Sequence, residues 1–246
     1  MRIGVSTHVM LAACAGPPPA EPPKGWTPGA PPELLALVPP DLRYVRVDIP
    51  PKQNAFTLWQ RAVAAFVHVQ GSPDLEAAWK RAIEGDGPFP GGEDGRLMSE
   101  WLDRNREALA LWMEGSRHTR CQYYPLLDGL HSLLPYLAPM KAMATAMSLR
   151  ARRSVAAGDL ESACEDLLAT LRCGDLAIDG DGSLLHVLVG IAIQHIAIDG
   201  LRQLAARPGV PQRILDSILA QSGSVLRAGE GLATAWRVEF CCCILP

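Results

Sequence analysis

The sequence predicts an all-α domain built of stacked antiparallel helical hairpins. Apolar residues recur at helical spacing through most of the chain from residue 52 onward. Asn, Asp, Pro and Gly stand where these periodic segments begin and end. A hydrophobic fraction of 48% supplies the core of one domain of ordinary size. We therefore divide the chain into residues 1–13, a Pro-rich segment 14–51 and a helical domain 52–246.

The first fourteen residues have the layout of an export signal. Arg2 supplies one positive charge, and a mildly apolar run with small residues precedes Cys14. The four residues from Leu11 to Cys14 (LAAC) resemble the lipobox of bacterial lipoproteins. This resemblance implies that residues 1–13 are a signal peptide that is removed, and that Cys14 receives a lipid. The alternative is an incorrectly assigned start codon, after which the first residues are apolar by chance.

A Pro-rich tether follows the cysteine. Twelve of the 21 prolines lie between Pro17 and Pro51. Because proline fixes φ and lacks a backbone donor, we expect this segment to be extended and semi-rigid. Near its end, residues 42–47 are either a short strand or an extended strap over the first helix. These features predict a domain anchored to a membrane through lipid, on the non-cytoplasmic face of the cell envelope.

The helical domain opens with a predicted hairpin. Asn54 is suited to cap a helix over residues 55–70, which Gly71 ends. Pro73 begins a second helix that extends through Ile83. Residues 85–95 form a loop by composition.

Two longer helices are predicted next. The first covers Leu97 to Met113 and places Asn105 among apolar neighbours, where we expect its amide to bond to the backbone of another helix. The second begins at Pro139 and extends to Ala157, with a row of methionines on its buried face. At its end we expect three arginines to form a solvated helix terminus: Arg150, Arg152 and Arg153.

One hairpin resembles a known repeat. Residues 151–171 are similar to the middle of a tetratricopeptide repeat at Ala151, Gly158, Ala163 and Leu167. The residues support a helical turn independently. Gly158 can adopt the left-handed conformation at a helix end, and Asp159 can cap the next helix. The match covers one hairpin, so it predicts stacked helices and no tandem array.

The most apolar segment contains no charged residue between Asp181 and Asp199. Either a membrane span near 184–198 or a central buried helix explains its composition. His186 and His195 are nine residues apart and so point to opposite sides of one helix, which excludes a shared metal ion. His186, Gly190 and Gln194 share one face, which is suited to close packing with a satisfied amide.

The sequence ends in an apolar run with three adjacent cysteines, Cys241, Cys242 and Cys243. Such a run can bind a soft metal or be acylated. We favour the alternative that the chain is truncated or frame-shifted within a helix.

The sequence contains no recognisable catalytic, metal-binding or cofactor-binding motif. A formal charge of −3 gives no attraction to nucleic acid. We therefore predict a non-enzymatic cell-envelope lipoprotein with a structural or protein-interaction role and an unidentified protein partner. The alternative, besides a membrane-spanning protein, is a helical enzyme that gathers Glu161, Glu165 and His131 into one site.

Overall fold

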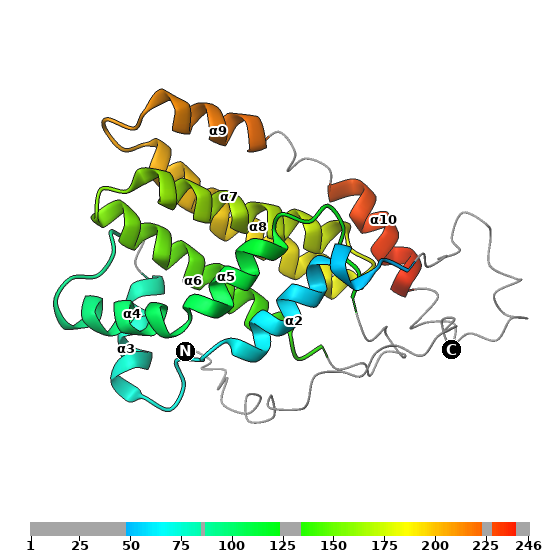
Figure 1. The fold of residues 1–246 in the computed structure, drawn as a ribbon, viewed down its shortest axis with the longest axis horizontal. Coiled ribbons are helices and arrows are strands. Elements are labelled where there is room, and N and C mark those ends of the chain that lie inside the picture. The colour runs from blue at the N-terminus through cyan, green and yellow to red at the C-terminus, as the bar shows by residue number, and fades with distance from the viewer. Residues whose placement is uncertain (1–47, 85–86, 124–133, 223–227, 240–246) are drawn as a thin grey trace, which may run out of the picture.

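The computed structural model describes residues 48–84, 87–123, 134–222 and 228–239, and these residues confirm the all-α fold (Figure 1). Besides a short 3₁₀ helix, Pro51–Gln53, and one isolated bridge between Asn54 and Arg120, their regular structure is α-helical. The α-helices are α2 Ala55–Ala65, α3 Pro73–Glu84, α4 Gly92–Arg104, α5 Arg106–Gly115, α6 Leu137–Ala156, α7 Leu160–Asp179, α8 Leu184–Ala205, α9 Gln212–Ser222 and α10 Ala228–Glu239.

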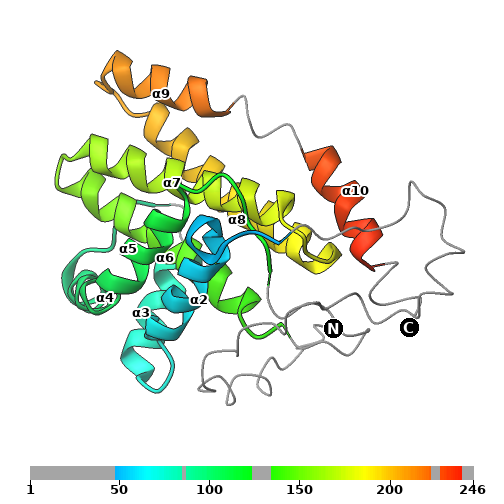
Figure 2. The same cartoon turned by 45° about the vertical axis from the view of Figure 1, so that its right-hand side comes forward.

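Three long helices form the centre of the molecule. Helix α7 packs along both α6 and α8, while α2 and α5 form a pair on one side (Figures 1 and 2). Helices α7 and α8 approach so closely that a Cβ atom added at Gly174 would lie 3.0 Å from the carbonyl oxygen of Gly190. Helices α9 and α10 pack separately at the two ends of this central layer.

The main core lies between α2, α5 and α6 and is rich in aromatic rings. Trp59 and Trp112 pack at 5.2 Å between ring centroids. Phe56 makes edge contacts with Tyr123 and Tyr136 at 4.9 and 4.8 Å. Such pairs stabilise a core beyond the burial of their area. The predicted methionine row of α6 is fully buried at Met140, Met143 and Met147.

Several predicted helix ends are confirmed. The Asn54 side chain accepts a hydrogen bond from the backbone N–H of Phe56 at 3.1 Å. Gly158 has φ +82°, and the Asp159 carboxylate accepts from the N–H of Ser162 at 3.0 Å. Helix α3 begins at Pro73 as expected. The α6–α7 hairpin therefore forms where the repeat-like residues predict it, and its likeness to a tetratricopeptide repeat stays a prediction.

Two predicted elements were wrong, and Asn105 explains both. The predicted helix from Leu97 to Met113 is divided at Asn105 into α4 and α5. The Asn105 amide accepts from the N–H of Val67 at 2.7 Å and donates to the Val67 carbonyl oxygen at 3.1 Å. Phe66, the residue after α2, is extended, and the two hydrogen bonds hold Val67 against Asn105, so α2 ends at Ala65 although its apolar pattern continues to Gly71.

Candidate functional site

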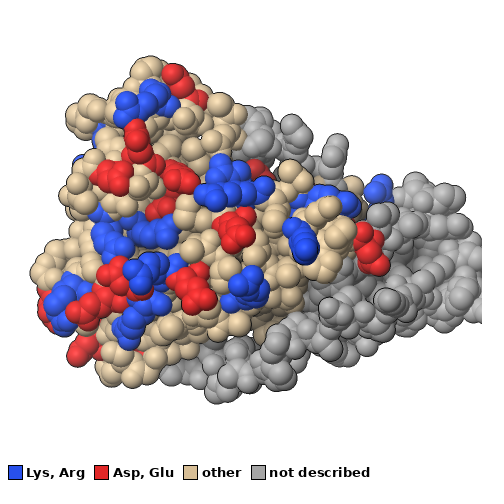
Figure 3. Space-filling model, in the orientation of Figure 1, with Lys and Arg blue, Asp and Glu red and all other residues tan. Residues whose placement is uncertain are grey.

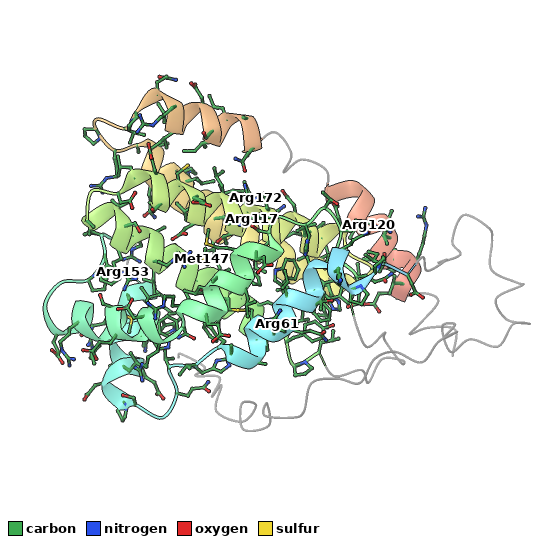
Figure 4. All side chains as sticks on the ribbon, viewed as in Figure 1. Arg61, Arg117, Arg120, Met147, Arg153 and Arg172 are labelled. Carbon is green, nitrogen blue, oxygen red and sulfur yellow. The ribbon has the colours of Figure 1, made fainter. Side chains whose placement is uncertain are left out.

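The carboxylates proposed for enzyme chemistry lie on the outer surface of α7. Glu161 pairs with Arg213 of α9. Glu165 lies 3.5 Å from Arg117, which follows α5 and is labelled in Figure 4. All four side chains are mostly exposed. The third proposed residue, His131, lies outside the described residues. The two glutamates are four residues apart on one face of α7, and each forms an exposed ion pair with an arginine.

The buried acid of this region is Asp166, which the sequence does not distinguish from its surface neighbours. Arg150 donates two hydrogen bonds of 2.6 and 2.8 Å to its carboxylate. The Asp166 side chain is 7% exposed and the Arg150 side chain is 19% exposed. Burial raises the pKa of Asp166, and the hydrogen bonds from Arg150 act against that rise. The pair joins α6 to α7, which gives it a structural role.

The prediction that the three arginines of α6 form a solvated helix end was wrong. Arg150 binds Asp166, and Arg153 lies 2.9 Å from Asp103 of α4. Arg152 donates to the carbonyl oxygens of Ala82 and Pro88 at 2.8 and 2.7 Å. Each arginine thus connects α6 to a different helix: Arg150 to α7, Arg152 to α3 and Arg153 to α4. The last turns of α6 are in contact with these helices and are not simply solvated.

A polar cavity of about 370 Å³ lies among these pairs. Arg150 pairs with Asp166 and Arg153 with Asp103. The lining contains three acidic and three basic side chains: Asp103, Glu165, Asp166, Arg106, Arg150 and Arg153. Lys, Arg, Asp and Glu are likewise mixed over this face of the molecule (Figure 3). The face therefore presents no broad field of one sign to a charged ligand.

A more apolar cavity, of about 520 Å³, lies between the last turns of α6 and α8. Its floor is apolar and includes Ala151, Leu167 and Leu204, with Arg207 and Gln203 at its rim. A third cavity of about 380 Å³ separates α7 from α9 and is lined by both Glu161 and Glu165. Both volumes are in the range of small-molecule sites.

His186 forms a buried polar cluster at the start of α8. Its Nδ1 accepts from the backbone N–H of Ser183 at 2.9 Å, so its Nε2 carries the hydrogen and donates to the Tyr136 hydroxyl at 2.7 Å. Burial lowers the pKa of His186 to about 4. Ser183 and His186 are 2% and 1% exposed and together cap α8, so the Ser–His contact is a structural one.

A second polar network connects the first described residues to the same place. The backbone N–H of Ile49 donates to Gln122 Oε1 at 3.0 Å, and Gln122 Nε2 donates to Asp181 at 2.6 Å. The Asn54 amide also donates to the Gln122 carbonyl oxygen at 2.7 Å. The chain that leaves the predicted tether is therefore fixed beside the turn between α7 and α8.

An exposed apolar surface begins at this end of α8. Leu185, Leu188 and Ile191 recur every three residues along the helix and are 54%, 61% and 45% exposed. On α10, Leu232 and Trp236 are 43% and 55% exposed. We call these five side chains the apolar face. The sequence does not distinguish the exposed residues of α8, because this helix is apolar on nearly every side. The buried side can be recognised from His186, Gly190 and Gln194, and the exposed side is the one opposite to it.

Helix α8 is, among the described helices, long and apolar enough to cross a membrane by length and composition. Its inner side packs as predicted: Gly190 lies against α7, and the Gln194 amide donates to Asp175. His186 is buried and His195 is exposed, which confirms that they lie on opposite sides.

The cysteines within the described ranges are Cys121, Cys164 and Cys173, and all three are buried free thiols. Burial raises the pKa of each, which disfavours the reactive thiolate. No group of three His, Cys, Asp or Glu side chains able to hold a metal ion is found in these ranges. Cys14 and the cysteines at 241–243 lie outside the described residues.

Comparisons with models of known protein families, with curated proteins and with solved structures found no match to this chain.

Proposed function

We propose that the protein is a non-enzymatic lipoprotein of the cell envelope, anchored to a membrane through Cys14 on the non-cytoplasmic face. The motif from Leu11 to Cys14 and the proline-rich segment that ends at Pro51 support the anchor and its tether. The helical domain then has a structural or protein-interaction role.

The observation that carries the non-enzymatic role is the use made of the charged groups. Asp166 is bound by Arg150, Glu161 by Arg213 and Glu165 by Arg117, and each pair joins two elements of the fold. A general acid or base must be free to exchange a proton with its substrate. The buried pair of Asp166 with Arg150 is suited to a structural role, and Glu161 and Glu165 lie in exposed ion pairs on a helix face, which favours a non-enzymatic role over a helical enzyme.

The mixed surface charge supports a role without nucleic acid. Binding to a phosphate backbone requires a basic stripe or patch. The face over α4–α7 alternates arginines with acidic residues (Figure 3). A partner that binds this face is therefore a protein with a similarly mixed surface, in keeping with a role in interaction.

The experiment that tests the anchor is the intact mass of the protein purified from its native membrane. The proposal predicts a chain that lacks residues 1–13 and carries a lipid at Cys14. Cells that produce a Cys14→Ala variant should instead yield an unlipidated protein, of which a smaller share fractionates with the membrane. An unprocessed, lipid-free mass for the unaltered protein would contradict the proposal.

The membrane span near 184–198 is the second candidate, and the length and apolar composition of α8 favour it. Alkaline carbonate extraction of the Cys14→Ala variant distinguishes the two. A chain that spans the bilayer stays in the membrane pellet, whereas an unlipidated lipoprotein is released. Because α8 packs its inner side on α6 and α7, we expect release.

A further inference from the structure

The two rows of the apolar face meet at one end of the molecule. Glu239, at the end of α10, accepts a hydrogen bond from the backbone N–H of Leu184 at 3.1 Å. Leu185 follows that residue directly, and Trp236 lies one turn before Glu239. Ala235 of α10 is buried and packs against Val187 of α8 and Ile178 of α7. The exposed rows of α8 and α10 are therefore neighbours on one continuous end of the fold.

The composition of this end is unusual for a water-exposed surface. Four aliphatic side chains and a tryptophan are each about half exposed, and no charged residue interrupts α8 before Asp199. Contiguous exposed apolar surface marks a contact with a membrane or another protein. Farther along α8 the same side becomes polar, with His195 3.2 Å from Asp199 and Arg202 3.4 Å from the same carboxylate. The apolar surface thus has a defined edge.

The predicted tether enters the fold at the same end. Ile49 is bound through Gln122 to Asp181, two residues before the Ser183 cap of α8. Figures 1 and 2 both show the first described residues, the start of α8 and helix α10 grouped together, with α9 farther away. The point where the described chain begins, at residue 48, therefore lies at the end of the domain that carries the apolar face.

We propose that the apolar face rests in the interfacial layer of a lipid bilayer; the identity of that bilayer as the one holding Cys14 rests on the proposed function. Leu185, Leu188 and Ile191 enter the boundary of the acyl chains, and Trp236 places its indole ring at the level of the headgroups. The bilayer is preferred to a protein partner because the face offers aliphatic and indole surface next to the tether. The contact is peripheral, since the opposite side of α8 is filled by α6 and α7.

The test uses the full chain with Cys14→Ala, so that no lipid on the protein contributes, mixed with phosphatidylcholine vesicles. Co-sedimentation measures the partition coefficient. The double variant Leu188→Glu/Ile191→Glu should lower it by roughly tenfold or more, because two half-exposed aliphatic side chains no longer enter the bilayer. The matched control is Leu219→Glu/Ile83→Glu, which places the same substitutions on α9 and α3 at 70% and 45% exposed positions. It should change the partition coefficient by less than about twofold.

A second measurement does not depend on a charged variant folding correctly. Vesicles with brominated acyl chains should quench tryptophan fluorescence of the Cys14→Ala chain, and Trp236→Phe should remove most of that quenching. Binding that is equal for both double variants, or quenching that survives Trp236→Phe, would overturn the inference. So would a dimer in analytical ultracentrifugation that the Leu188→Glu/Ile191→Glu variant separates into monomers. A lipid-free native protein that still binds vesicles through this face would overturn the anchor and leave this inference standing.

Discussion

Helices α7 and α8 are antiparallel neighbours of similar length, and they are buried to very different extents. Thirteen of the 20 residues of α7 are buried, against eight of the 22 residues of α8. Yet α7 contains six charged residues, whereas α8 contains none before Asp199. The more apolar helix is the more exposed one.

The difference follows from the number of neighbours around each helix. Helix α7 is covered by α5, α6, α8, α9 and α10, while α8 packs against α6, α7 and α10 along one side. The charges of α7 remain compatible with burial because arginines from other helices reach them, as Arg150 reaches Asp166. Apolarity therefore predicts that a helix has a buried side, and its neighbours decide how much of the circumference is buried.

The largest loss in the free energy of unfolding should come from breaking the buried ion pair between Asp166 of α7 and Arg150 of α6. Arg150→Met leaves the Asp166 carboxylate buried without its partner, and we expect a loss of about 3–5 kcal/mol in the free energy of unfolding. The double variant Arg150→Met/Asp166→Leu should recover most of this loss, because no buried charge remains. Urea denaturation followed by circular dichroism measures both. A loss below about 1 kcal/mol for the single variant would mean that the pair behaves as a surface salt bridge.

The inner side of α8 should be sensitive to acid through His186. Its pKa is about 4 in the folded protein, below the ordinary value of 6.5. The unfolded chain therefore binds more protons between these two values, so stability falls as the pH falls through that window, by about 3 kcal/mol at pH 4. The rings of Tyr123 and Tyr136 that face His186 stay neutral there, since burial raises both of their pKa values.

The control for this prediction is His186→Gln, which keeps a polar side chain and cannot titrate. Unfolding free energies measured from pH 7 to pH 4 should fall less steeply for this variant than for the unaltered protein. A residual slope is expected from His68, whose pKa is also lowered by burial. Identical slopes for the two proteins would show that His186 is accessible to protons in the folded state.

The contact between α7 and α8 can be tested with a smaller change. A Cβ atom at Gly190 would lie 2.7 Å from Ile178 Cγ1 and 3.0 Å from the carbonyl oxygen of Gly174. Gly190→Ala should therefore cost about 1–3 kcal/mol, despite the better helix propensity of alanine. On the same helix, Gly200→Ala meets the Leu167 side chain, which can rotate away, and should cost less. Thermal unfolding of the two variants compares them directly; an equal cost would mean that the helices separate easily.

The parts of the fold that local residues determine were predictable from the sequence. Asn54, Pro73 and Gly158 mark helix ends by their own chemistry, and the structure confirms each. The errors involve partners that are distant in the sequence. Asn105 divides a helix by binding Val67, 38 residues away, and the arginines of α6 bind carbonyl and carboxylate groups on three other elements.

The apolar face could not be predicted from the sequence for a different reason. A helix that is apolar on nearly every side gives no periodic signal for its exposed side, so the sequence left a span and a buried helix as equal explanations for 184–198. Its side toward α7 could be identified from the small and polar residues, His186, Gly190 and Gln194, which the structure buries. The exposed side depends on where α10 packs, and that contact joins residues more than fifty positions apart.

The smallest change in the free energy of unfolding should come from the outer side of α8. This prediction tests directly whether that side is exposed. Leu188 is 61% exposed, so Leu188→Asn should change the free energy of unfolding by less than about 0.5 kcal/mol, as expected for a surface position. The same substitution should weaken binding to vesicles, because the side chain is withdrawn from the bilayer and not from the core. A loss of stability above about 1 kcal/mol would show that Leu188 is covered in the folded chain. In that case the apolarity of α8 is explained by burial after all, and the contrast with α7 disappears.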